Sequence, residues 1–121
     1  MPIKKPVSDK DIKSDNYFQK VFDVTCLIPV GRVTTYGAIA DFLALGSARM
    51  VGWALNNCHA KDNTVPAHRV VNRLGVLSGR NHFSTPTLMQ LRLEKEGILI
   101  KDDRVVKMDV HFWHPREIVQ Y

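Results

Sequence analysis

The chain has 121 residues, which is enough for one domain with a single hydrophobic core but not for two. Its hydrophobic share of 45% and charged share of 24% are ordinary for a globular protein, and no apolar run approaches the roughly 18 residues that a membrane-spanning helix requires. The net charge of +5 favours a polyanionic partner, because a basic surface attracts phosphates whatever their sequence.

The first segment, residues 1–13, is polar and shows no core-forming pattern. Its charge comes from four lysines: Lys4, Lys5, Lys10 and Lys13. We predict a flexible basic N-terminal arm here. The segment also lacks the apolar stretch of a secretory signal, so we expect a cytoplasmic protein without membrane attachment.

The first predicted helix covers residues 15–28, where apolar side chains recur at helical spacing. These side chains are Phe18, Val21, Phe22, Val24, Leu27 and Ile28. The following residues, 29–32, contain proline and glycine and break the helix.

Two short helices are predicted next. Thr34 or Thr35 can cap the first of them, and Gly46 ends it. Ser47 can cap the second, which covers residues 48–57. Because only a few residues separate these helices, the pattern predicts a helix-turn-helix pair.

The helix over residues 48–57 has two distinct faces. One face is apolar and predicts core contacts, through Val51, Ala54, Leu55 and Cys58. The other face carries a cation, a glycine and an aromatic ring, through Arg49, Gly52, Trp53 and Asn56. Glycine inside a helix costs about 1 kcal/mol relative to alanine. Its presence on this face indicates that another molecule approaches the backbone closely.

The second half of the chain begins with a loop over residues 59–66 and a short buried strand at Val70–Val71. Residues 72–83 form a second loop, in which Gly75 and Gly79 serve as hinges. We expect Thr85 to cap the next helix, with Pro86 in its first turn and Gly97 at its end. Its core-facing residues are predicted to be Leu88, Leu91 and Met89.

A two-stranded hairpin is predicted from Ile98–Lys101 and Arg104–Lys107, joined by Asp102–Asp103. The fold class is therefore mainly α with a small β-hairpin, arranged as a winged helix-turn-helix domain over residues 14–108. The tail, residues 109–121, contains Phe112, Trp113 and Pro115, and we predict that it packs back on the domain.

The hexapeptide Pro66-Ala67-His68-Arg69-Val70-Val71 carries the strongest functional signal. It resembles the active-site signature of the O6-alkylguanine-DNA alkyltransferases, which reads Pro-Cys-His-Arg-Val. In that family the cysteine thiolate accepts the alkyl group from the damaged guanine. A methyl group has no nucleophilic lone pair, so Ala67 cannot accept it. The resemblance therefore implies lesion recognition without alkyl transfer, with Ala67, His68 and Glu96 as vestigial catalytic positions and no catalytic residue.

Further matches to this family extend over residues 17–100. Residues 34–40 resemble its helix with a tyrosine beside the target phosphate, and residues 47–52 resemble its recognition helix. Asn57 matches a hinge asparagine, residues 77–79 match the loop that covers the flipped base, and residues 93–98 match the segment that ends in the catalytic glutamate.

The resemblance implies base flipping, because O6 lies at the pairing edge of guanine and becomes accessible only outside the base stack. Arg49 is expected to fill the hole in the duplex, and Tyr36 to hold the rotated phosphate. The expected DNA-binding residues, in the minor groove, are Tyr36, Ala48, Arg49, Gly52 and Asn57. The expected lesion pocket consists of Tyr36, Pro66, Ala67, His68, Val70, Leu77, Ser78 and Arg80.

The expected partner is double-stranded DNA that contains O6-alkylguanine, and nucleotide excision repair proteins are the implied second partner. We expect a monomer without a cofactor or metal. A zinc site built on Cys58, His59 and His68 would lack the usual ligand set.

Two other functions remain open at this point. An active alkyltransferase with Cys58 as a displaced acceptor is opposed by Ala67. A winged-helix transcription regulator is opposed by residues 66–71 and by Arg49, because a regulator requires neither.

Overall fold

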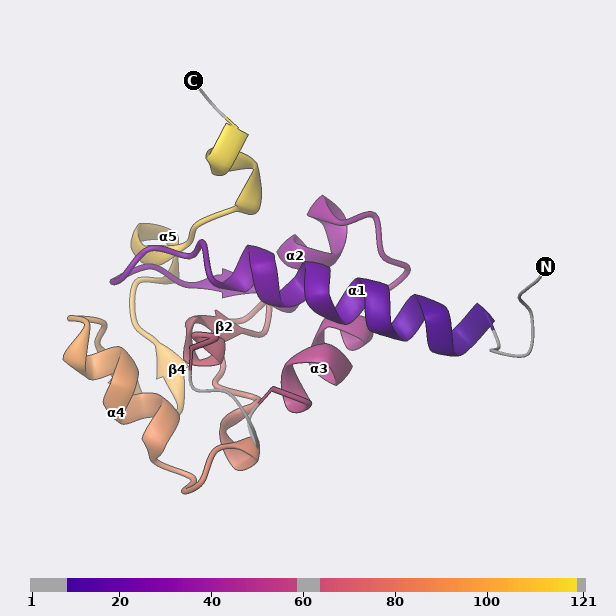
Figure 1. The fold of residues 1–121 in the computed structure, drawn as a ribbon. Coiled ribbons are helices and arrows are strands. Elements are labelled where there is room, and N and C mark those ends of the chain that lie inside the picture. Colours follow the sequence, from indigo (N-terminus) through magenta and orange to yellow (C-terminus); the bar gives the residue numbers. More distant parts are fainter. Residues whose placement is uncertain (1–8, 59–63, 120–121) are drawn as a thin grey trace.

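Three helices form one half of the molecule, namely α1 (Asp9–Thr25), α2 (Tyr36–Phe42) and α3 (Ala48–Asn56). The structure, a computed structural model, describes residues 9–58 and 64–119. α2 packs on α3, and both contact α1, which runs across them in Figure 1. Their shared core contains Val21, Ile39, Val51, Leu55 and Val70, all at most 2% exposed.

α1 begins at Asp9 rather than at residue 15 and ends at Thr25 rather than at Ile28. Residues 9–13 of the predicted arm are therefore helical, and residues 1–8 lie outside the described part of the chain. At the other end, the buried Thr25 hydroxyl donates to the Val21 carbonyl at 2.7 Å, and Ile28 N–H bonds to Thr25 O in a tighter turn.

Thr35 caps α2, since its hydroxyl oxygen accepts a hydrogen bond from the Ala38 N–H at 3.0 Å. The predicted end of this helix at Gly46 is wrong. α2 ends at Phe42, because Ala44 takes the left-handed conformation with φ 56° and Leu45 N–H bonds to Ala40 O at 2.9 Å. Ser47 stands at the cap position of α3, but its side chain makes no capping hydrogen bond.

A short parallel pair of strands connects the two halves of the molecule. β1 (Thr34–Thr35) pairs with β2 (Val70–Val71), in the register Thr34 to Val70 and Thr35 to Val71. The sequence predicts the buried strand at Val70–Val71 but not its partner. This pairing sets the short 3-10 helix η2 (Ala67–Arg69), which directly precedes β2, close to the start of α2.

α4 (Leu88–Lys95) follows η3 (Arg80–His82) after residues 83–87, and it starts at Leu88 rather than at Pro86. Thr85 is therefore not its cap. Gly97, with φ +89°, ends the helix as predicted. The predicted core face is wrong for Leu91, which is 56% exposed. Met89 is buried as predicted, and Leu88 is partly buried. Leu93, which was not predicted, is also buried, because it lies four residues after Met89 on the same face of the helix and both contact the second core cluster.

The predicted hairpin is confirmed as β3 (Ile100–Lys101) and β4 (Arg104–Val105), an antiparallel pair. Asp102 and Asp103 both have positive φ, 53° and 61°, as a two-residue hairpin turn of the I′ type requires. The fold class, mostly helical with one small antiparallel pair, is thereby confirmed. In Figure 1 the hairpin lies beside α4, away from α3.

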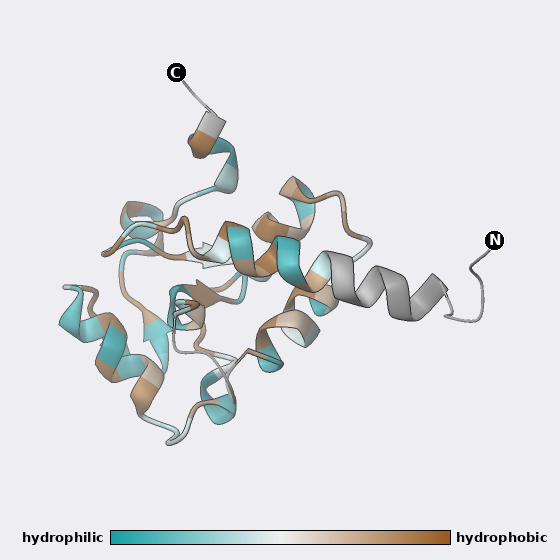
Figure 2. Cartoon of the chain, viewed as in Figure 1, coloured by the Kyte–Doolittle hydropathy of each residue, from teal (hydrophilic) through white to brown (hydrophobic). Residues whose placement is uncertain are grey.

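The C-terminal segment packs on the body of the molecule through α5 (Met108–His111) and the 3-10 helix η4 (Pro115–Val119). Trp113 is only 4% exposed, and its backbone N–H donates to Val33 O at 2.7 Å. The helices carry both hydrophobic and hydrophilic residues (Figure 2). Of the helices in the described ranges, none has the length and apolar character to cross a membrane.

Candidate nucleic-acid interface

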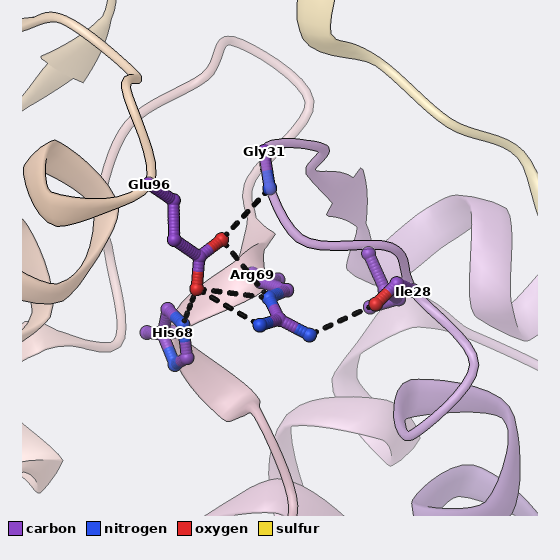
Figure 3. Close-up of polar contacts among 5 residues, drawn as sticks. All are labelled: Ile28, Gly31, His68, Arg69 and Glu96. Carbon is purple, nitrogen blue, oxygen red and sulfur yellow. Dashed lines mark hydrogen bonds and ion pairs between the residues drawn. The ribbon is translucent and has the colours of Figure 1, made fainter.

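Glu96, the C-cap residue of α4, joins two other segments of the chain through its carboxylate (Figure 3). His68 Nε2 lies 2.7 Å from Glu96 Oε2, and Arg69 Nη2 lies 2.9 Å from the same oxygen. Gly31 N–H donates to Glu96 Oε1 at 3.0 Å, and Arg69 Nη1 donates to Ile28 O at 2.9 Å. Arg69 thus fixes its loop between a carboxylate and a backbone carbonyl.

The charge state of this network follows from its contacts. Burial raises the pKa of Glu96, but hydrogen bonds from Arg69, Gly31 and His68 outweigh it and hold the pKa at about 2. Burial lowers the pKa of His68 more than the neighbouring carboxylate raises it. With its pKa below 6.5, His68 is neutral near pH 7 and donates its Nε2 hydrogen to the Glu96 carboxylate, which can only accept. Its buried Nδ1 is then an acceptor, and it has no partner among the described residues.

Such a network can carry a proton away from a neighbouring thiol, but the neighbour here is Ala67. This residue is 6% exposed, and its side chain is a methyl group. The vestigial positions predicted from the sequence, Ala67, His68 and Glu96, therefore lie together. What the network does in this chain is join residues 28–31, η2 and the end of α4.

A second feature is a surface hollow between α2 and α3 with a volume of about 350 Å³. Four predicted DNA-binding residues line it together: Tyr36, Ala48, Arg49 and Gly52. Trp53 and Asn56 complete its wall, although neither was among the predicted site residues. Trp53 is 53% exposed, which was already indicated by its place on the polar face of the helix.

The fifth predicted DNA-binding residue, Asn57, does not line the hollow. It stands at the C-terminal cap of α3, where its side-chain amide donates to Trp53 O at 2.8 Å. This contact closes the last turn of the helix and supports the position of Trp53.

Gly52 has no role in the internal packing of α3. A Cβ atom placed on it meets nothing within 4 Å, and its φ is not positive. Neither sterics nor backbone conformation therefore requires glycine here, although glycine weakens the helix. The loss of helix stability caused by Gly52 is explained if another molecule lies against this face of α3.

Tyr36 links the hollow to the loop over residues 77–80. Its hydroxyl interacts with the Ser78 side chain, and it lies 2.7 Å from the position that a Cβ on Gly79 would occupy. Burial raises the pKa of Tyr36, so its phenol stays protonated and available as a donor near neutral pH. A side chain at position 79 would therefore force the Tyr36 hydroxyl to move.

The remaining predicted pocket residues differ in accessibility. Pro66 is half-buried directly before η2, and Ser78 is exposed. Val70 and Leu77 have 0% exposure and belong to the two core clusters, so their contact with a bound base stays a prediction. Arg80 donates to Leu77 O at 3.0 Å and forms an ion pair with Asp103 at 3.8 Å. No sequence signal pointed to Asp103, because that contact depends on how the hairpin docks.

Comparison with known proteins agrees with this geometry. The family model described as 6-O-methylguanine DNA methyltransferase, DNA binding domain, matches residues 16–98. The chain belongs to this family. The match covers the hollow, η2 and α4 together.

Two relatives extend the match. Alkyltransferase-like protein 1 of Schizosaccharomyces pombe is 35% identical over 109 residues, covering 86% of this chain and 100% of the relative. The DNA base-flipping protein of Escherichia coli is 33% identical over 114 residues, covering 92% of this chain and 84% of the relative. A solved structure of the S. pombe protein, in complex with damaged DNA containing O6-carboxymethylguanine, superposes with a TM-score of 0.73 at 36% identity and covers 84% of this chain and 97% of that one.

Within residues 9–58 and 64–119, no three His, Cys, Asp or Glu side chains are grouped so that they could hold an ion. His59, considered above as a zinc ligand, lies outside these ranges.

Proposed function

We propose that this protein is a non-enzymatic DNA damage-recognition protein that binds O6-alkylguanine in duplex DNA. It flips the modified base and holds the complex for nucleotide excision repair. The observation that carries the proposal is an intact His68–Glu96–Arg69 network beside Ala67, where the alkyl acceptor of an alkyltransferase would stand. The relatives, one named a DNA base-flipping protein and one solved with damaged DNA, support DNA as the partner.

The hollow between α2 and α3 suggests how the protein meets the duplex. Ala48 and Gly52 present little side chain, so α3 approaches the minor groove closely. Arg49 is exposed on the same face and extends into the base stack, where its planar guanidinium replaces the flipped base. Tyr36 donates its phenol hydrogen to the phosphate of the rotated nucleotide, and Asn57 holds the end of α3 in place.

The flipped base enters a pocket between residues 66–68 and the loop over residues 77–80. His68 offers Nδ1 as a buried acceptor on this side, and Arg80 supplies a cation on the other. Ala67 leaves the room that a sulfur atom would fill, which suits substituents on O6 that are larger than methyl. The protein acts as a monomer in the cytoplasm, and it needs no cofactor because no bond is broken.

The alternative of a displaced acceptor is weak. Cys58 is 4% exposed on the core side of the chain, and its thiol donates to Leu55 O at 3.0 Å. A thiol buried in this way is a poor nucleophile, because burial in apolar surroundings disfavours the thiolate.

One experiment with two readouts tests the proposal. The protein is mixed with a duplex that contains O6-methylguanine and with the matched guanine duplex, at the same stated salt concentration. Fluorescence anisotropy gives both affinities, and intact-mass measurement follows. Preferential binding without a mass change is the expected result. A mass gain of one methyl group would make the protein an enzyme, and equal affinities would leave only sequence-independent binding.

A further inference from the structure

The loop over residues 77–80 is held on two sides by elements that are distant in the sequence. On one side, Tyr36 at the start of α2 packs against Gly79 and interacts with Ser78. On the other side, the turn between β3 and β4 reaches it, where Leu77 N–H donates to Asp103 O at 2.9 Å. The loop that carries the proposed pocket residues is thus clamped before any DNA binds.

Asp103 makes a second contact with the same loop. Its carboxylate lies 3.8 Å from Arg80 Nη2, while Arg80 Nη1 donates to Leu77 O at 3.0 Å. The two contacts use different nitrogens of one planar guanidinium, so together they restrict its direction. The Arg80 and Asp103 side chains are 33% and 49% exposed, so the pair adds little to the stability of the fold. The effect of the ion pair is to hold the Arg80 guanidinium in one position.

We propose that Asp103 is a positioning residue that holds Arg80 toward the pocket and thereby sets the discrimination between O6-alkylguanine and guanine. This inference rests on the proposed function. A guanidinium that is already oriented loses less conformational freedom when a flipped base arrives beneath it. The same carboxylate offsets the Arg80 charge, so that an unflipped duplex gains less from sequence-independent phosphate attraction.

The turn offers a matched pair of variants. Asp103→Asn removes the charge and keeps a residue that tolerates positive φ, so the hairpin and the bond from Leu77 N–H are retained. Asp102→Asn removes the same charge from the neighbouring position, which also has positive φ but forms no ion pair with Arg80 in the described structure. The two variants therefore change the net charge equally and differ in the Arg80 contact.

The measurement is the ratio of affinities for the O6-methylguanine duplex and the guanine duplex, at one salt concentration, for both variants. Both variants should bind the guanine duplex more tightly, and to a similar degree, because each removes a negative charge. Only Asp103→Asn should lower the ratio, by about two- to fivefold, which is the range of a partly exposed ion pair. In an Arg80→Gln background, Asp103→Asn should have no further effect on the ratio.

Three results would overturn the inference: an unchanged ratio in Asp103→Asn, an equal fall in Asp102→Asn, or a fall that persists in the Arg80→Gln background. The affinity ratio of the wild type tests the proposed function independently of the variants. A wild type that binds both duplexes equally removes the proposed function, whereas a discriminating wild type with an unaffected Asp103→Asn removes only the role of Asp103.

Discussion

The imidazole of His68 lies 2.7 Å from the carboxylate of Glu96, yet the residue before His68 is an alanine. His68 and Glu96, which would take up the proton of a thiol, are in contact, but residue 67 has no thiol to release one. The simplest test of this relationship is to supply the thiol.

Ala67→Cys should give the protein alkyltransferase activity. With His68 and Glu96 in place, the new thiol can lose its proton, and its sulfur can bond to the alkyl carbon while the carbon–O6 bond breaks. The expected result is a mass gain of one methyl group on incubation with an O6-methylguanine duplex. Ala67→Ser is the control, because a hydroxyl is a far weaker nucleophile near neutral pH. No gain in the cysteine variant would mean that the network no longer serves position 67.

Arg49→Ala should weaken binding to the lesion duplex by about tenfold or more, since a side chain that fills the base stack contributes more than one phosphate contact. Lys95→Ala, which removes an exposed cation from α4, is the matched control and should cost about two- to threefold at most. Fluorescence anisotropy with both duplexes measures the two losses. Equal losses for the two variants would contradict the insertion of Arg49.

Gly52→Ala should separate stability from function. Because a Cβ there meets nothing within 4 Å, the variant should be more stable by about 0.5–1 kcal/mol, as expected for glycine to alanine inside a helix. It should also bind DNA more weakly, because the added methyl group keeps α3 farther from the groove. Urea unfolding and anisotropy measure the two effects, and a stabilised variant with undiminished DNA binding would show that nothing approaches this face closely.

The stability of the protein should fall on acidification in two stages. Burial lowers the pKa of His68 from its ordinary 6.5, so protons favour the unfolded chain once the pH drops below that value. The pKa of Glu96 falls from 4.5 to about 2, so its stabilising contribution is complete above about pH 4.5 and is lost as the pH approaches 2. Urea unfolding across this pH range measures both stages.

Glu96→Gln identifies the group responsible for the second stage. It should destabilise the protein at pH 7 by about 2–4 kcal/mol, because Arg69 loses its charged partner, and it should flatten the dependence below pH 4.5. Glu94→Gln is the control, since Glu94 is exposed on α4 and its side chain contacts only Gln90 among the described hydrogen bonds. If Glu94→Gln flattens the profile as much as Glu96→Gln, the acid dependence has another origin.

Much of the local structure was predictable from the sequence, because it depends on neighbouring residues. Thr35 caps α2 and Gly97 ends α4, each through contacts within one turn. The hairpin turn at Asp102–Asp103 and the two faces of α3 follow in the same way from short-range pattern. The hexapeptide over residues 66–71 likewise indicated the family before any coordinates, because its chemistry lies in consecutive side chains.

Other features were decided only by tertiary structure. Leu91 and Leu93 suit a helix core equally well by hydropathy, and only the docking of α4 buries Leu93. β1 is too short to predict, since its strand exists through pairing with β2. Glu96 and Asp103 acquire their roles from partners that lie 27 and 23 residues away in sequence, Arg69 and Arg80. A sequence pattern shows only how residues are spaced along the chain. Contacts between distant residues depend on the tertiary fold, which is determined by burial of the whole core.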